Sequence, residues 1–241
     1  MATSPKVLII PGLNGHPGLL MRASGELFPR WEAVAFNHHL DLCDGGVVGL
    51  AQRALAELPG EDAVWVCGES FGGTVALTLA HLYPRRVKGL ILLSAFGWHP
   101  STLARRGAGA LAVWSFLGHR VGNTMYRAGR VASLPTQLGL RFPRDLFQSY
   151  ISRPRAHVAA YRVKAELSLT FDARPWLSTL ACPTFVLAGT WDPVVPASAG
   201  RELAHSMPNA TLHTLAGGHL VHLVNAHRVG GMIDDWARDL H

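Results

Sequence analysis

The run Gly68-Glu69-Ser70-Phe71-Gly72-Gly73 decides the fold of this chain, because it separates two segments of opposite character. The β-branched and aromatic stretch 63–67 before it predicts a buried strand, and the stretch 72–82 after it predicts a helix that ends before Pro84. Small residues on both sides of Ser70 let the chain bend sharply and expose the serine hydroxyl. The pattern Gly-x-Ser-x-Gly alone is a weak signal, so the flanking strand and helix carry the prediction.

The rest of the chain alternates between strand-like and helix-like segments. Strands are expected near 6–10, 32–36, 63–67, 88–93, 183–188 and 210–214, and helices near 18–28, 47–58, 72–82, 197–206 and 221–240. Such alternation indicates a parallel sheet with helices on both faces, because a parallel crossover needs a covering helix. The predicted fold class is therefore α/β, with a doubly wound, mostly parallel sheet of about six strands.

Composition favours one compact domain with an insertion. The chain has 241 residues and 49% hydrophobic content, enough for a single full core. Its three cysteines are widely spaced and set in apolar surroundings, which favours reduced thiols and a cytoplasmic location over disulfides. The N-terminus shows no signal-peptide pattern, and the longest apolar stretch, 108–117, is too short to span a membrane.

A serine nucleophile needs a base within hydrogen-bonding distance and a carboxylate that orients this base. Asp192 lies in the loop after the strand expected at 183–188, and His219 lies in the turn after the strand expected at 210–214. The chain order is therefore serine, aspartate, histidine, each at the C-terminal end of its own strand. No carboxylate follows the strand near 88–93, although an aspartate before a proline also suits an Asx turn.

Each of these assignments has a competitor. Ser70 could serve only as a helix N-cap, a position that favours serine. His213 lies inside a predicted strand, His222 should fall in the following helix, and His16 is a lone loop histidine, so only His219 occupies the turn after a strand. The histidines show no metal-ligand spacing such as His-Glu-x-x-His, and we expect neither a metal nor a cofactor.

An oxyanion would be stabilised by the amide after the nucleophile and by one from the loop after the first strand. That loop is Pro11-Gly12-Leu13-Asn14-Gly15, so the oxyanion hole is assigned to the N–H groups of Leu13 and Phe71. The side chain of Asn14 is a candidate for substrate binding. A glycine-rich loop here also suits phosphate, but it lacks the spacing of both common phosphate-binding motifs.

Together these motifs resemble the α/β-hydrolase superfamily. The resemblance rests on the loop 11–15, the run 68–73, the Gly189-x-x-Asp192 loop and the Gly217-Gly218-His219-Leu220 turn, and it spans nearly the whole chain except roughly residues 98–175. It implies the sheet order 2-1-3-4-5-6, with a crevice where the order reverses around the first and third strands. Many relatives have His-Gly where this chain has Pro-Gly, and the chain starts at the strand that is usually third.

The resemblance implies a carboxylic-ester hydrolase in which Ser70, His219 and Asp192 form a catalytic triad and a small-molecule acyl ester is the substrate. A serine at this turn argues against dehalogenase or epoxide hydrolase chemistry, which in this superfamily uses aspartate there. Two alternatives stay open: acyl transfer or thioester cleavage on the same triad, and a ligand-binding protein with an idle triad.

Residues 98–175 join the fourth and fifth expected strands and read as helices broken by glycine and proline. We expect them to form a helical cap over the site, inserted into a core of residues 1–97 and 176–241. Apolar cap residues such as Trp114 and Phe116 are expected to bind the acyl group. The cap is also basic, with Arg105, Arg106, Arg120, Arg127, Arg130, Arg141, Arg144, Arg153, Arg155, Arg162 and Lys164 against Asp145, Glu166 and Asp172.

Two interpretations of this basic cap stay open. One is a solvated outer face above an apolar underside. The other is attraction to an anionic membrane surface, or to a substrate that carries a carboxylate, a phosphate or coenzyme A. Nucleic acid is a poorer explanation, because no recognised binding motif accompanies the charge. No pattern in the sequence indicates the oligomeric state.

Overall fold

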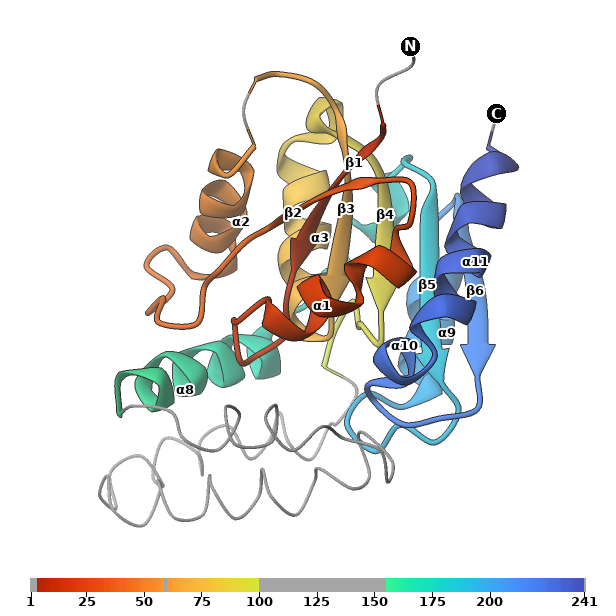
Figure 1. Cartoon of the computed structure of the whole chain (residues 1–241). Helices are drawn as coiled ribbons and strands as arrows, with labels where there is room; N and C mark the ends of the chain where they lie inside the picture. The colour runs from red at the N-terminus through yellow and green to blue at the C-terminus, as the bar shows by residue number, and fades with distance from the viewer. Residues whose placement is uncertain (1–3, 59, 100–154, 241) are drawn as a thin grey trace.

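The computed structural model of the protein describes residues 4–58, 60–99 and 155–240 (Figure 1). Six strands form one fully parallel sheet in the order β2-β1-β3-β4-β5-β6, which confirms the expected topology. The strands are β1 (Lys6–Ile10), β2 (Glu32–Ala35), β3 (Val64–Glu69), β4 (Val87–Leu93), β5 (Thr184–Gly189) and β6 (Ala210–Leu215).

Helices cover both faces of the sheet (Figure 1). One face carries α2 (Gly46–Ala56), α3 (Phe71–Leu82) and α9 (Ala197–His205), and the other carries α1 (Gly18–Leu27), α10 (Val221–Val224) and α11 (Ala226–Arg238). Two short 3-10 turns, Pro84–Arg86 and Leu177–Thr179, precede β4 and β5. This arrangement confirms the doubly wound fold class.

Alternation along each strand divides the core into two layers. In β1, Leu8 and Ile10 pack into the core on the α3 face, whereas Val7 and Ile9 pack into the core on the α11 face. The central strands β3 and β5 are buried at every position, which explains why they read as continuous apolar runs. The sheet is therefore a rigid support whose C-terminal edge carries the loops singled out above.

The last helix differs from the expectation of one continuous helix over 221–240. It breaks at Asn225, whose backbone leaves the helical region with φ −118° and ψ 35°. The Val221 carbonyl accepts two hydrogen bonds from Asn225, one from its backbone N–H and one from its side-chain amide, each 3.0 Å long. The break separates the short α10, beside the His219 turn, from the long α11.

The two ends of the segment 98–175 lie side by side. Trp98 and Asp172 form an antiparallel bridge, and the Ala173 N–H donates to the Gly97 carbonyl at 2.8 Å. Helix α8 (Arg155–Thr170) lies near the C-terminal ends of the strands (Figure 1). Trp114 and Phe116 lie outside the described residues, so the cap and its division from the core stay predictions.

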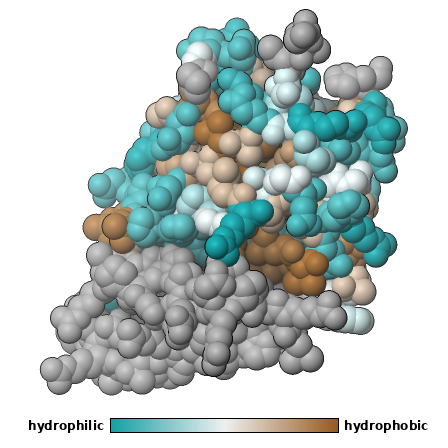
Figure 2. Space-filling view, viewed as in Figure 1, coloured by the Kyte–Doolittle hydropathy of each residue, from teal (hydrophilic) through white to brown (hydrophobic). Residues whose placement is uncertain are grey.

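Figure 2 shows hydrophilic residues mainly along the outer sides of the described part of the visible face, and more apolar residues in its centre and near α10. Val224 in this helix is 60% exposed. Among the helices within residues 4–58, 60–99 and 155–240, none combines the length and the apolar character that crossing a membrane would require.

Candidate active site

Ser70 makes the whole turn between strand and helix. β3 ends at Glu69 and α3 begins at Phe71, so a single residue reverses the chain direction. Its φ of 52° and ψ of −120° lie in a region that residues with a side chain rarely adopt. The turn is held by hydrogen bonds from the Ser70 N–H to the Leu93 carbonyl and from the Gly73 N–H to the Ser70 carbonyl, both 2.9 Å. A strained serine held in this way presents its hydroxyl at the edge of the sheet.

Gly68 and Gly72 of the motif must be glycines, because neighbouring backbone atoms lie too close to leave room for a Cβ. A Cβ on Gly68 would lie 2.6 Å from the Gly72 carbonyl oxygen, and a Cβ on Gly72 would lie 2.1 Å from the Ile10 carbonyl oxygen. Neither position can hold a side chain without moving β1 or α3. The same packing brings the first strand and its loop against the turn.

The structure brings Ser70, His219 and Asp192 into one hydrogen-bonded chain. His219 Nε2 lies 3.0 Å from Ser70 Oγ, and His219 Nδ1 lies 2.7 Å from Asp192 Oδ2. All three residues are less than 10% exposed. When Nδ1 donates its proton to the carboxylate, Nε2 is left as the acceptor for the serine hydroxyl. The arrangement can therefore take a proton from Ser70.

Asp192 makes the contacts that each of the two uses weighed from the sequence would require. Its Oδ1 accepts the N–H groups of Val194 and Val195 at 2.8 and 2.9 Å, which is an Asx-type turn. Its Oδ2 remains for His219. The turn therefore fixes the direction in which the carboxylate faces the imidazole.

Ser94, directly after β4, supports the turn that carries His219, and this role was not predicted from the sequence. It follows β4 with a positive φ of 50°, and its hydroxyl donates to the His219 carbonyl at 2.7 Å. The only signal in the sequence was a small polar residue directly after a buried strand.

The loop 11–15 lies directly against the turn at Ser70. A Cβ on Gly12 would lie 3.4 Å from the Ser70 Cβ. The Gly12 carbonyl accepts the Gly15 N–H at 2.9 Å, so the trans peptide turns the Leu13 N–H to the opposite side. Phe71 is the first residue of α3, where an N–H has no acceptor within the helix. These are the two amides expected from the sequence.

Asn14 has a local role in this loop. Its Oδ1 accepts the His16 N–H at 2.8 Å, as in an Asx turn. His16 in turn accepts the Gly18 N–H through Nδ1 at 3.0 Å. Substrate binding by Asn14 stays a prediction.

Glu69, the residue before the serine, is a buried carboxylate that sequence reasoning passed over. Its Oε2 accepts the Gly12 N–H at 3.1 Å, and its Oε1 lies 3.4 Å from Nε2 of the fully buried His222. Burial by itself raises the pKa of Glu69, but the neighbouring His222 imidazole, with the Gly12 N–H, holds it below its usual range. An acidic residue at the end of an otherwise apolar strand was the signal available.

A second buried group, Lys164 of helix α8, is connected to the loop 11–15 through His38. The sequence places Lys164 on a solvated or substrate-facing basic surface, and this is wrong, because the residue is completely buried. Its ammonium donates to the His38 carbonyl at 2.5 Å and lies 3.5 Å from His38 Nδ1. His38 Nε2 lies 3.0 Å from the Pro11 carbonyl, which it can reach as a donor. Burial, with the Lys164 charge, lowers the pKa of His38 to about 3, so the ring is neutral.

His213, the remaining alternative to His219 as the base, is not part of the hydrogen-bonded chain that includes Ser70. His213 in β6 stacks on Phe185, with ring centroids 4.3 Å apart, and burial lowers its pKa. Within the ranges that the structure describes, no three His, Cys, Asp or Glu side chains gather as metal ligands would.

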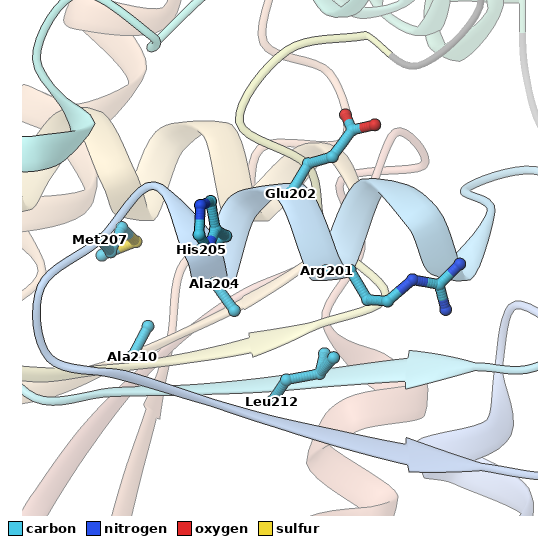
Figure 3. A pocket seen from close by; sticks show the side chains of 7 residues that line it. All are labelled: Arg201, Glu202, Ala204, His205, Met207, Ala210 and Leu212. Carbon is cyan, nitrogen blue, oxygen red and sulfur yellow. The ribbon is translucent and has the colours of Figure 1, made fainter.

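A surface pocket of about 710 Å³ opens far from the triad. Its lining includes Arg201 and His205 of α9, Met207 in the following loop, and Ala210 and Leu212 of β6 (Figure 3). Ala210 begins β6, whereas the triad gathers where the strands end. The pocket is therefore separate from the site.

The chain is similar to known proteins along most of its length. A family model described as the alpha/beta hydrolase fold matches residues 43–226. The Poly(3-hydroxyalkanoate) depolymerase of Ectopseudomonas oleovorans is 33% identical over 178 residues, which are 70% of this chain and 58% of that protein. The Magnesium-chelatase 30 kDa subunit of Rhodobacter capsulatus is 32% identical over 180 residues, which are 71% of this chain and 62% of that protein. The chain thus spans less than two thirds of the length of these relatives.

The fold is also that of solved structures. A thermophilic esterase from Thermogutta terrifontis, with malate bound, superimposes with a TM-score of 0.76 at 21% identity, over 100% of this chain and 92% of that chain. Because the family model covers most of the chain and the parallel sheet carries a strand, serine and helix turn at its third strand, the protein belongs to the alpha/beta hydrolase fold family.

Proposed function

We propose that the protein is a serine hydrolase that cleaves a carboxylic ester of a small molecule through an acyl-enzyme. The observation that carries the proposal is the chain of hydrogen bonds from Ser70 through His219 to Asp192. A serine hydroxyl is a poor nucleophile at neutral pH, and a neutral imidazole held by a carboxylate is the base that activates it. The relatives known as a depolymerase and an esterase support a hydrolytic reaction.

In the first half of the reaction, His219 Nε2 takes the proton of Ser70 as Oγ attacks the ester carbonyl. The carbonyl oxygen becomes an oxyanion, and the N–H groups of Leu13 and Phe71 stabilise it. The C–O bond between the carbonyl carbon and the alcohol then breaks, and the protonated imidazole, stabilised by Asp192, gives its proton to the oxygen of the leaving alcohol. The product of this half is an acyl group on Ser70.

In the second half, His219 takes a proton from water, and the hydroxide attacks the acyl carbonyl. The C–O bond to Ser70 Oγ then breaks, and the imidazole returns the proton to the serine. An acceptor alcohol in place of water gives acyl transfer, and a thiol leaving group gives thioester cleavage. Apolar cap residues such as Trp114 and Phe116 would bind the acyl chain in each case.

Labelling of the serine tests the proposal. A fluorophosphonate should modify Ser70 in the wild type, and Ser70→Ala should lose both the label and the hydrolysis of p-nitrophenyl esters while its circular dichroism stays unchanged. A folded Ser70→Ala variant with full activity would exclude the triad. Coenzyme A thioesters of matched acyl length, measured in parallel, distinguish an esterase from a thioesterase.

We further propose a cytoplasmic location. Cys43, Cys67 and Cys182 are free thiols, and the first two are buried. Burial raises the pKa of the Cys43 thiol to about 11, which keeps it protonated and unreactive. Thiols of this kind suit a reducing compartment.

A further inference from the structure

The carboxylate of Glu69 joins three parts of the site. Glu69 ends β3 directly before Ser70, and its Oε2 accepts the N–H of Gly12 in the loop that supplies an oxyanion amide. Its Oε1 contacts His222 in α10, the helix that follows the His219 turn. One side chain therefore connects the nucleophile strand, the oxyanion loop and the helix behind the base.

A buried carboxylate at this position destabilises the fold unless neighbouring groups compensate for its lost hydration. The other residues of β3 are apolar or glycine, and an unpaired carboxylate among them would lose its hydration without compensation. The Gly12 N–H donates to this carboxylate, and Nε2 of His222 lies 3.4 Å from its other oxygen, and these two neighbours hold the pKa of Glu69 below its usual range. An ionised acceptor makes the hydrogen bond to the Gly12 N–H stronger than a neutral one would.

The hydrogen bond to Gly12 matters because glycine is the residue with the most backbone freedom. The Gly12 carbonyl is held by the Gly15 N–H, and the Gly12 N–H is held by Glu69. With both ends of Gly12 fixed, neither of its backbone dihedrals can rotate. The plane of the next peptide, which carries the Leu13 N–H, is then fixed as well.

We propose that Glu69 is a positioning residue that holds the oxyanion loop against Ser70 through the Gly12 N–H, while its other carboxylate oxygen faces His222. The inference rests on the proposed function and deepens it, since it gives a role to a residue outside the triad. Glu69 acts through the Gly12 peptide and does not touch the substrate.

Two variants separate the hydrogen bond from the bulk of the side chain. Glu69→Ala removes the acceptor, and we expect kcat to fall roughly 10- to 100-fold with little change in KM, because loss of one oxyanion donor costs on the order of 10²- to 10³-fold. Glu69→Gln keeps an oxygen that can accept the Gly12 N–H, and we expect it to restore most of kcat. The rate of fluorophosphonate labelling should follow the same order, since that reaction also forms an oxyanion.

Thr78→Val is the matched control. Thr78 is a buried polar residue of α3 whose hydroxyl donates to the Thr74 carbonyl, one helical turn away and outside the site. This variant also removes a buried hydrogen bond, so its thermal unfolding measures the general cost of such a loss. Its kcat should stay at the wild-type value.

The amide proton of Gly12 gives a readout that needs no catalysis. In the wild type, a carboxylate acceptor should move its NMR resonance strongly downfield, and Glu69→Gln should move it back upfield. If the Gly12 amide resonance has the same position in the wild type and in Glu69→Gln, the proposal is overturned, even if Glu69→Ala fails to fold. A folded Glu69→Ala with wild-type kcat, or a Glu69→Gln as impaired as Glu69→Ala, would overturn it too. If the wild type itself shows neither labelling nor hydrolysis, the proposed function fails, and the Gly12 resonance still tests the hydrogen bond.

Discussion

The hydroxyl of Ser94 donates a 2.7 Å hydrogen bond to the backbone carbonyl of His219, across 125 residues of sequence. Ser94 is fixed in turn by its own N–H, which donates to the Leu187 carbonyl of β5 at 2.8 Å. The turn that carries the imidazole is therefore tied to the end of β4, in the middle of the sheet. A flexible loop would place the base less accurately than this contact does.

Removal of the Ser94 hydroxyl should therefore lower activity without touching the triad. Ser94→Ala and Ser94→Gly both leave the buried His219 carbonyl without its donor, and we expect kcat to fall roughly 3- to 10-fold in each. The alanine variant should also be less stable than the glycine variant, because residue 94 has a positive φ. Steady-state kinetics and thermal unfolding of the pair measure the two effects. Wild-type kcat in Ser94→Gly would show that the tie is not needed.

The two oxygens of Asp192 predict different results for two substitutions. Asp192→Asn should lower kcat by roughly 10³- to 10⁴-fold, because the wrong histidine tautomer is then favoured. Its stability should change little, since an amide oxygen can still accept the N–H groups of Val194 and Val195. Asp192→Ala should be as inactive and also lose about 1–3 kcal/mol of unfolding free energy. An Asp192→Asn variant within tenfold of wild-type kcat would contradict the assignment of the triad acid.

His38 predicts acid sensitivity of the fold. Its pKa is about 3 in the folded state against an ordinary value of 6.5, so the unfolded state binds the proton more readily. The free energy of unfolding should therefore fall as pH drops from about 6.5 towards about 3, by up to about 1.4 kcal/mol per pH unit from this group. His38→Gln can still donate to the Pro11 carbonyl but cannot titrate, and it should show a shallower slope in denaturant unfolding at graded pH. An identical slope in wild type and variant would refute this account.

Neighbouring glycines in α11 predict opposite effects on stability. A Cβ on Gly230 would lie 1.9 Å from the Glu26 carbonyl oxygen of α1, so Gly230→Ala should destabilise the fold by about 1–3 kcal/mol or more. A Cβ on Gly231 would meet nothing within 4 Å, so Gly231→Ala should stabilise the helix by about 0.5–1 kcal/mol. Thermal unfolding of the two variants tests the packing of α11 on α1. Equal shifts would show that the two helices do not approach this closely.

The elements of this fold, and the order in which the triad residues occur, could be predicted from the sequence because their signals are local. Apolar runs, glycines and prolines mark each strand and helix within a few residues. Parallel strands all end at one edge of the sheet, so Ser70, Asp192 and His219 were expected to meet there. The break at Asn225 was missed, because an asparagine whose backbone leaves the helical region has the same sequence signal as one that stays within a helix.

The tertiary structure alone decided what holds the site in place. Glu69 and Gly12 are 57 residues apart, and Lys164 and His38 are 126 residues apart, so no local pattern relates them. Lys164 resembles the arginines around it in sequence, yet it is buried, and His222 reads as a bystander, yet it faces Glu69. A buried charge is tolerated only where packing brings its partners to it, and that depends on how distant segments meet. The sequence therefore determined which residues could form the proposed triad, and the tertiary structure determined the polar contacts that keep them aligned.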